Sequence, residues 1–154
     1  MMHLTGEFKV TLDEKGRISL PALLRRCLNE SNLFLTEGSE NCLWLYPGSQ
    51  WNDMINTIMK NTDPFSKKDR NLRRRIIGPS QEVEIDKAGR IPIAVSLREF
   101  AGLSKDCVVL GQVDYIEIWD EECYKKFLND SNDEYNTASE ELSISLKKQR
   151  GISD

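Results

Sequence analysis

Asp13-Glu14-Lys15-Gly16-Arg17 is the stretch that decides how the rest of this chain is interpreted, because it returns 73 residues later as Asp86-Lys87-Ala88-Gly89-Arg90. Apolar residues alternate on both sides of each copy, which is the period-2 pattern of a half-buried strand. Gly16 and Gly89 can take the positive φ that a short hairpin loop needs. The sequence therefore predicts two copies of one hairpin-bearing module, in which the loops are the functional part.

The strand phase assigns a direction to each side chain of the first loop. If apolar residues such as Leu12 and Ile18 face the core, the residues between them face outward. Asp13 and Arg17 then flank the loop on its outer side, where an ion pair between them would close the hairpin.

The elements after the first loop follow from local signals. Pro21 suits the start of a short helix, and Ser49 is a candidate cap for a longer one. Ser66-Lys67-Lys68-Asp69 resembles a capping box, and Gly78 follows the last turn of the helix that the box opens. The expected elements are a helix over 22–28, strands over 33–36 and 43–46, a helix with apolar residues from Trp51 to Met59, and a helix that Gly78-Pro79 ends.

A gapless alignment at the same offset extends the repeat beyond the loops. Residues 13–47 match residues 86–120 at 8 of 35 positions, including Leu24 with Leu97 and Arg25 with Arg98. The matching apolar phase and the absence of gaps indicate an internal repeat. Residues after Asn129 are polar and weakly periodic, and we expect a frayed helix or a disordered tail there.

Composition and charge restrict the class of protein. The 154 residues are 39% hydrophobic and 30% charged, with a net charge of −4. The acidity is mostly C-terminal, since residues 117–154 carry 10 acidic and 5 basic side chains while residues 1–116 carry 15 and 16. No apolar run is long enough to span a bilayer, and the N-terminus has no signal-peptide pattern. The spacing of the cysteines suits neither a zinc site nor a disulfide framework. We expect an intracellular protein with reduced cysteines, no metal and no cofactor; the cysteines are Cys27, Cys42, Cys107 and Cys123.

The two D-x-x-G-R loops resemble those of the MraZ family. Each is followed by a strand, a short helix containing Leu-Arg, and strands ending in an aromatic residue. The similarity is strongest over residues 70–93 and covers roughly Gly6 to Leu128. The chain departs from the family pattern at Ala94, where proline is usual, so we expect the second helix to begin less sharply than the first.

The resemblance implies an α+β fold, in which two tandem AbrB/SpoVT-like modules interleave as a pseudo-two-fold swapped-hairpin β-barrel surrounded by short helices. The expected organisation is a first module at 6–52, a helical linker at 53–79, a second module at 80–128 and a polar acidic tail at 129–154. It also implies a ring-shaped homo-oligomer that binds short direct repeats in promoter DNA. Such a protein would regulate, as a repressor, the division and cell-wall gene cluster, including its own promoter.

The basic side chains of the two loops are the candidate DNA contacts. An arginine can bind guanine or a phosphate through two parallel hydrogen bonds, whereas a lysine suits phosphate alone. The candidates are Arg17 and Arg90 as base or shape readers, with Lys15 and Lys87 on phosphates. The supporting residues are Asp13, Gly16, Asp86 and Gly89. The alternative is that both Asp–Arg pairs only close their loops.

A second basic run lies in the linker. It is a candidate for contact with DNA or with a neighbouring subunit, and a solvated helix face is the third option left open. The run consists of Arg70, Arg73, Arg74 and Arg75.

Two other classes of protein fit the sequence less well. An antitoxin-like or other protein-interaction module could use the barrel and the acidic tail, although such antitoxins generally carry one module per chain. An enzyme ranks last because the chain shows no nucleophile–base pair, metal cluster or phosphate loop. We expect a cytoplasmic, nucleoid-associated protein with no membrane partner and no small-molecule substrate.

Overall fold

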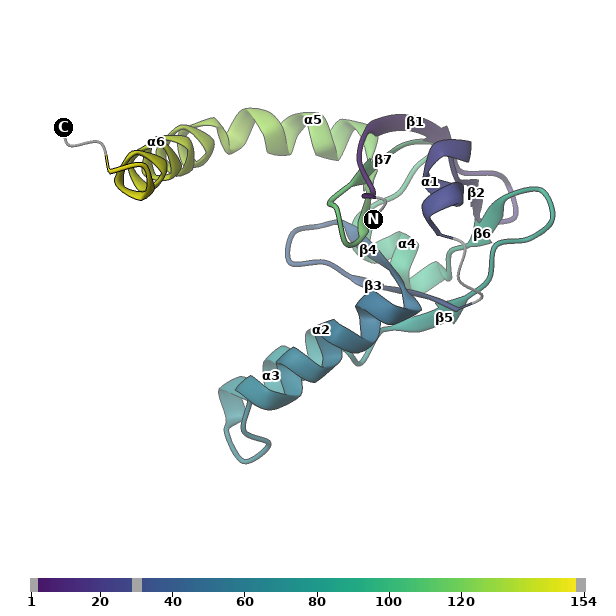
Figure 1. The fold of residues 1–154 in the computed structure, drawn as a ribbon. Helices are drawn as coiled ribbons and strands as arrows, with labels where there is room; N and C mark the ends of the chain where they lie inside the picture. Colours follow the sequence, from purple (N-terminus) through teal and green to yellow (C-terminus); the bar gives the residue numbers. More distant parts are fainter. Residues whose placement is uncertain (1–2, 29–31, 152–154) are drawn as a thin grey trace. The chain divides into compact units, whose positions relative to one another are not determined.

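The computed structural model describes residues 3–28 and 32–151, which form eight strands and six helices (Figure 1). The strands are β1 (Glu7–Thr11), β2 (Arg17–Ser19), β3 (Leu33–Glu37), β4 (Leu43–Pro47), β5 (Gln81–Val83), β6 (Arg90–Pro92), β7 (Asp106–Gly111) and β8 (Ile116–Asp120). The helices are α1 (Ala22–Cys27), α2 (Gly48–Asn61), α3 (Lys67–Ile76), α4 (Val95–Ala101), α5 (Glu121–Asp130) and α6 (Asn132–Gln149).

The two modules are interleaved through their strand pairing. One six-stranded antiparallel sheet has the order β1-β7-β8-β4-β3-β5, and β2 and β6 form a second sheet of two strands. The first strand of each module therefore pairs with a strand of the other module, because β1 pairs with β7 and β5 pairs with β3. The predicted α+β class and the interleaving are confirmed. The predicted closed barrel is not, since in the described residues the six-stranded sheet ends at β1 and β5.

The predicted hairpin strands are not each other's main partners, which corrects the simple hairpin interpretation. β1 pairs with β7 along all five of its residues, whereas it meets the segment of β2 only at the bridge between Leu12 and Ile18. The longer ladder satisfies more backbone groups of β1 than the three-residue β2 could. The loop between them is consequently anchored to two different sheets.

The core is built from both modules in the predicted phase. Ile18 and Ile91 lie opposite each other in the β2–β6 pair, and both are fully buried. Leu24 of α1 and Leu97 of α4 are also almost completely buried. Fully burying a side chain of this size stabilises the fold by about 1.5–3 kcal/mol. The apolar alternation therefore identified the buried face correctly.

The two short helices begin with the same geometry. Pro21 precedes α1 with φ −56° and ψ 142°, and Ala94 precedes α4 with φ −60° and ψ 150°. The expectation of a less sharp start at the second helix is wrong. Ala94 adopts the φ that proline would impose, because the surrounding chain fixes it there.

The helices of the linker confirm one predicted cap and correct another. Ser66 caps α3, since its hydroxyl accepts a hydrogen bond from the N–H of Asp69 at 3.3 Å. Ser49 does not cap α2, because that helix already begins at Gly48. Trp51 of α2 stacks on Phe34 of β3 with ring centroids 5.1 Å apart, which anchors the start of α2 on the sheet.

The chain divides into two compact units, 1–121 and 122–154. The first contains the eight strands and the helices α1 to α4 of the described residues. In the second, most of the expected tail forms the 18-residue helix α6, so the polar segment is helical rather than disordered. In the part of the chain that the structure describes, no helix is both long enough and apolar enough to cross a membrane. The finer module boundaries stay predictions.

Candidate nucleic-acid interface

The first loop is closed by a single aspartate. Oδ1 of Asp13 accepts hydrogen bonds from the backbone N–H groups of Lys15 and Arg17, both at 2.9 Å. Its Oδ2 accepts one from Nε of Arg17, also at 2.9 Å. Gly16 has φ +77°, as the turn requires. The predicted ion pair across the loop is thus confirmed.

The second loop repeats this construction. Asp86 accepts hydrogen bonds from the N–H groups of Ala88 and Arg90 at 2.9 Å and from Nε of Arg90 at 3.0 Å. The hydrogen bond from the Arg17 N–H lowers the pKa of the Asp13 carboxyl, and that from the Arg90 N–H lowers the pKa of Asp86. Both aspartates are therefore held as carboxylates that shape their loops.

The aspartates orient the two arginines without occupying their ends. Each carboxylate engages Nε, and among the described residues no acceptor binds the terminal Nη groups of Arg17 or Arg90. The side chains are 26% and 34% exposed, respectively. Each guanidinium is thereby fixed at its inner edge while its outer N–H groups can donate to a ligand.

The two loops meet at one ribbon rather than forming separate tips. In the β2–β6 pair Arg17 lies opposite Pro92 and Ser19 lies opposite Arg90. Since Ile18 and Ile91 face the core, both arginines lie on the outward face. Their Cα atoms are about 8 Å apart, given a rise of ~3.4 Å per residue and the spacing between strands. Figure 1 shows both loops beside this ribbon.

Backbone hydrogen bonds lock each loop to the other module. The N–H of Ile93 donates to the carbonyl of Gly16, and the N–H of Leu20 donates to the carbonyl of Gly89, both at 2.9 Å. These residues immediately follow the opposite strand, so the ribbon and the loops form one pseudo-symmetric frame.

Two further arginines lie against the loop glycines. A Cβ added at Gly16 would lie 2.6 Å from Nη1 of Arg98, and one at Gly89 would collide with the guanidinium of Arg25. Nε of Arg98 is buried and has no hydrogen-bond partner among the described residues. Sequence reasoning did not include this pair in the site, although its identity at the 73-residue offset was the available signal.

The loop lysines are exposed, and they break the symmetry. Lys15 is the third residue of its motif and Lys87 the second, and both side chains are open to solvent. The second position of the first loop carries Glu14 instead. The two loops therefore have the same backbone conformation but present different charges to solvent.

The arginine run of α3 divides into two pairs. Arg70 donates to the carbonyl of Pro64, and Arg73 donates to Oγ1 and the carbonyl of Thr62, so this pair ties α3 to the preceding loop. Arg74 and Arg75 are exposed. Figure 1 shows α2 and α3 extending away from the β2–β6 ribbon, which separates the run from the two loops.

Comparison with known proteins agrees with this repeated architecture. The family model described as "MraZ protein, putative antitoxin-like" matches residues 3–75 and again 76–146, so the second match includes most of α6. A "Transcriptional regulator MraZ" of Treponema denticola is 48% identical over 139 residues, covering 90% of this chain and 96% of the relative. Its namesake in Treponema pallidum strain Nichols is 43% identical over 138 residues, covering 90% and 93%. The chain, with its two matched repeats, belongs to the MraZ family.

Proposed function

We propose that this protein is a DNA-binding transcriptional regulator that reads promoter DNA with the outward face of the β2–β6 ribbon. The observation that carries the proposal is the state of Arg17 and Arg90. Each is oriented through Nε by an aspartate, while its terminal N–H groups remain open. The relatives of this protein in two Treponema species are named transcriptional regulators, which supports a role in transcriptional regulation.

The chemistry of the ribbon suits duplex DNA. A two-stranded ribbon fits the major groove, where an arginine can donate to O6 and N7 of guanine. Lys15 and Lys87 would contact phosphates, which position the protein without reading sequence. Arg25 and Arg98 add two positive charges behind the loops. Asp13 and Asp86 act as positioning residues, because a carboxylate repels phosphate.

The test is a double substitution, Arg17→Ala with Arg90→Ala, assayed by gel shift on the DNA upstream of the protein's own gene. Each bidentate contact contributes about 1–3 kcal/mol, so we expect at least a ~30-fold loss of affinity. A matched control is Arg74→Ala with Arg75→Ala, which removes the same charge from α3. Equal binding by the loop variant and the wild type would refute the proposal, and equal losses in both variants would indicate a nonspecific charge effect.

Salt dependence separates phosphate contacts from base contacts. Affinity that falls steeply with salt marks released counterions. Lys15→Gln should reduce the slope of log K against log salt by about 1, because the lysine would bind one phosphate. A protein that binds another protein rather than DNA would show no such slope on the promoter fragment.

We also propose that the protein assembles into a homo-oligomeric ring on short direct repeats. Two ribbon arginines per chain make few contacts, and linked copies raise avidity without new chemistry. The helix α3 carries six basic side chains and one acidic one, and the helix α6 carries four acidic and two basic ones. This suits a head-to-tail contact between copies, which gives a ring when the rotation from one copy to the next closes. Tandem repeats should bind far more tightly than one repeat, and equal affinity would contradict the assembly.

The target and location are proposed from the family resemblance. The protein represses the division and cell-wall gene cluster, including its own promoter. It is cytoplasmic and nucleoid-associated, and its interleaved modules work as one swapped-hairpin barrel. A promoter–reporter fusion tests the sign of regulation, since deletion of the gene should raise expression from a repressed promoter.

An antitoxin-like or other protein-interaction role is the second candidate. The observation that favours it is an apolar hollow of about 600 Å³ in the second unit, lined by residues that include Phe127, Leu128 and Tyr135. Tyr135 is 70% exposed. The substitution Tyr135→Ser should leave promoter binding by a single copy unchanged if this surface serves a protein partner.

A further inference from the structure

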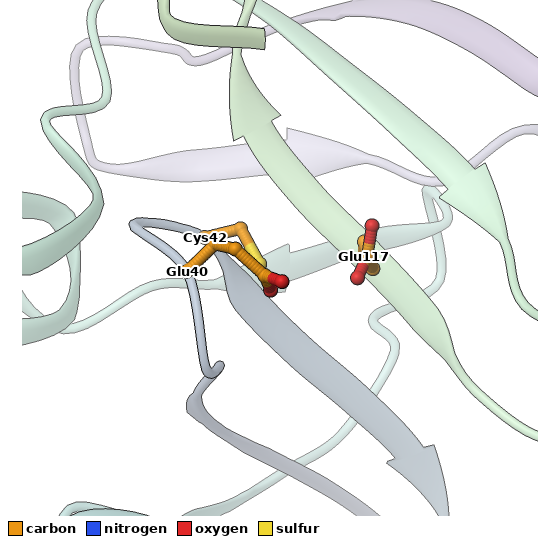
Figure 2. Close-up of side chains that lie close together, drawn as sticks. All are labelled: Glu40, Cys42 and Glu117. Carbon is orange, nitrogen blue, oxygen red and sulfur yellow. The ribbon is translucent and has the colours of Figure 1, made fainter. Parts of the chain in front are cut away.

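Three metal-ligating side chains converge on the sheet, away from the ribbon. Glu40 and Cys42 come from the turn that leads into β4, and Glu117 comes from β8. Figure 2 shows the carboxylate of Glu40 beside the thiol of Cys42, with Glu117 close to both. One ligand atom from each residue lies within 4.8 Å of the others.

The buried carboxylate of this cluster lacks the cationic partner that a buried charge normally has. Cys42 is 0% exposed and Glu117 is 9% exposed. Oε1 of Glu117 accepts a hydrogen bond from the indole N–H of Trp119 at 3.1 Å. Within residues 3–28 and 32–151, no lysine, arginine or histidine forms an ion pair with Glu40 or Glu117. Two carboxylates therefore face each other without a cation.

The thiol of Cys42 gives an independent indication. The thiols of Cys27 and Cys107 donate to backbone carbonyls, whereas in the described chain no carbonyl accepts a hydrogen bond from the thiol of Cys42. It is completely buried and aimed at the carboxylates. A buried sulfur beside two carboxylates is an arrangement that can bind a cation.

We propose that Glu40, Cys42 and Glu117 bind one Zn²⁺ ion. A thiolate with two carboxylates is a donor set that zinc accepts, whereas magnesium and calcium take oxygen ligands alone. A tetrahedral zinc ion needs ligand atoms about 3.3–3.6 Å apart, so the exposed side chain of Glu40 closes onto the ion. Water takes the fourth position, and binding releases the thiol proton to solvent.

Such an ion would fasten the two modules to each other. Glu40 and Cys42 belong to the first module and Glu117 to the second, where its Cα lies opposite that of Trp44 in the β4–β8 pair. At the 73-residue offset, Glu40 and Cys42 correspond to Val113 and Tyr115. The second module therefore has no copy of the site, and each chain should bind one ion.

The experiment uses the full chain, stripped of metal with a chelator and kept reduced. Titration with Co²⁺ should give one equivalent of binding with a thiolate-to-cobalt charge-transfer band, which Zn²⁺ then abolishes. Cys42→Ser should remove the band, while Cys107→Ser, at another fully buried cysteine, should keep it. Glu117→Gln and Glu40→Gln should each weaken zinc binding at least about tenfold. Zinc should also raise the Tm of the wild type and not that of Cys42→Ser.

Three results would overturn the proposal. They are no cobalt or zinc binding at micromolar protein, a charge-transfer band that survives in Cys42→Ser, and unchanged zinc affinity in both glutamine variants. If circular dichroism shows that Cys42→Ser does not fold, Glu40→Gln decides the question, since Glu40 is exposed and its substitution leaves the core intact. The variant Arg17→Ala with Arg90→Ala should bind zinc as the wild type does, so this test stands apart from that of DNA binding.

Discussion

Gly16 is where one added methyl group tests the architecture of the interface most directly. Its φ of +77° lies in the left-handed region, where an L-residue costs about 1–2 kcal/mol. The new Cβ would also lie 2.6 Å from Nη1 and 2.8 Å from Cζ of Arg98. Displacing that guanidinium adds about 0.5–1 kcal/mol. We expect Gly16→Ala to lower the free energy of unfolding by about 1.5–3 kcal/mol and the Tm by about 3–12 °C.

A double-mutant cycle with Arg98→Ala separates the two contributions. Without the guanidinium the methyl group has room, so Gly16→Ala should then cost only the backbone part, about 1–2 kcal/mol. Urea and thermal unfolding followed by circular dichroism measure all four proteins. The same cycle with Gly89→Ala and Arg25→Ala should behave alike, because the second loop has the same construction.

Two outcomes would refute this reasoning. If the effects of Gly16→Ala and Arg98→Ala add to within about 0.3 kcal/mol, the arginine does not lie against the loop. If Gly16→Ala costs less than about 0.5 kcal/mol, the loop does not hold the left-handed conformation.

Three more variants test other parts of the fold. The double substitution Asp13→Asn with Asp86→Asn removes two carboxyl groups whose pKa is lowered by folding. Such groups stabilise the fold above their unfolded pKa of about 3.9. They lose this stabilising contribution as the pH falls through the folded pKa. Thermal scans should therefore show a lower Tm at neutral pH and a shallower decline in acid, and parallel curves would contradict this. Ala94→Pro should raise the Tm by about 1–4 °C, because the φ of −60° already suits proline; a fall would show that the N–H of this residue is needed. Thr36→Val should lower the free energy of unfolding by about 1–3 kcal/mol in urea, since it leaves the carbonyl of Ile76 without its donor; no change would mean that solvent replaces the bond.

The features that the sequence predicted correctly are local ones. Asp13 and Arg17 lie four positions apart, so the ion pair, the loop and the positive φ of Gly16 depend on five consecutive residues. The buried phase of Ile18 follows from alternation within a short strand. Ser66 caps α3 through a residue three positions away. Each of these features depends on residues that lie within a few positions of one another in the sequence.

The features that the sequence did not predict depend on which strands become neighbours in the sheets. Alternation shows which face of a strand is buried, but a hairpin and an exchange between modules bury the same residues. It could not show that β2 pairs with β6, or that Arg98 reaches the loop of Gly16. The arginine run is a related case, because the hydrogen bonds of Arg73 to Thr62 depend on how α3 meets the preceding loop.

The pseudo-symmetry that the strand exchange creates affects whether the proposed DNA-binding face can distinguish the two directions along a duplex. A two-fold symmetric protein favours palindromic sites, because its halves present identical contacts. Here the backbone of the ribbon is pseudo-symmetric, with Arg17 and Arg90 in equivalent places, while the loops differ. Lys15 is third in one loop, and Lys87 is second in the other. The face of a single chain therefore has two unlike ends, so reversing the duplex brings each base to a different set of charges. That property suits direct repeats, in which every copy of the protein meets its site in the same orientation.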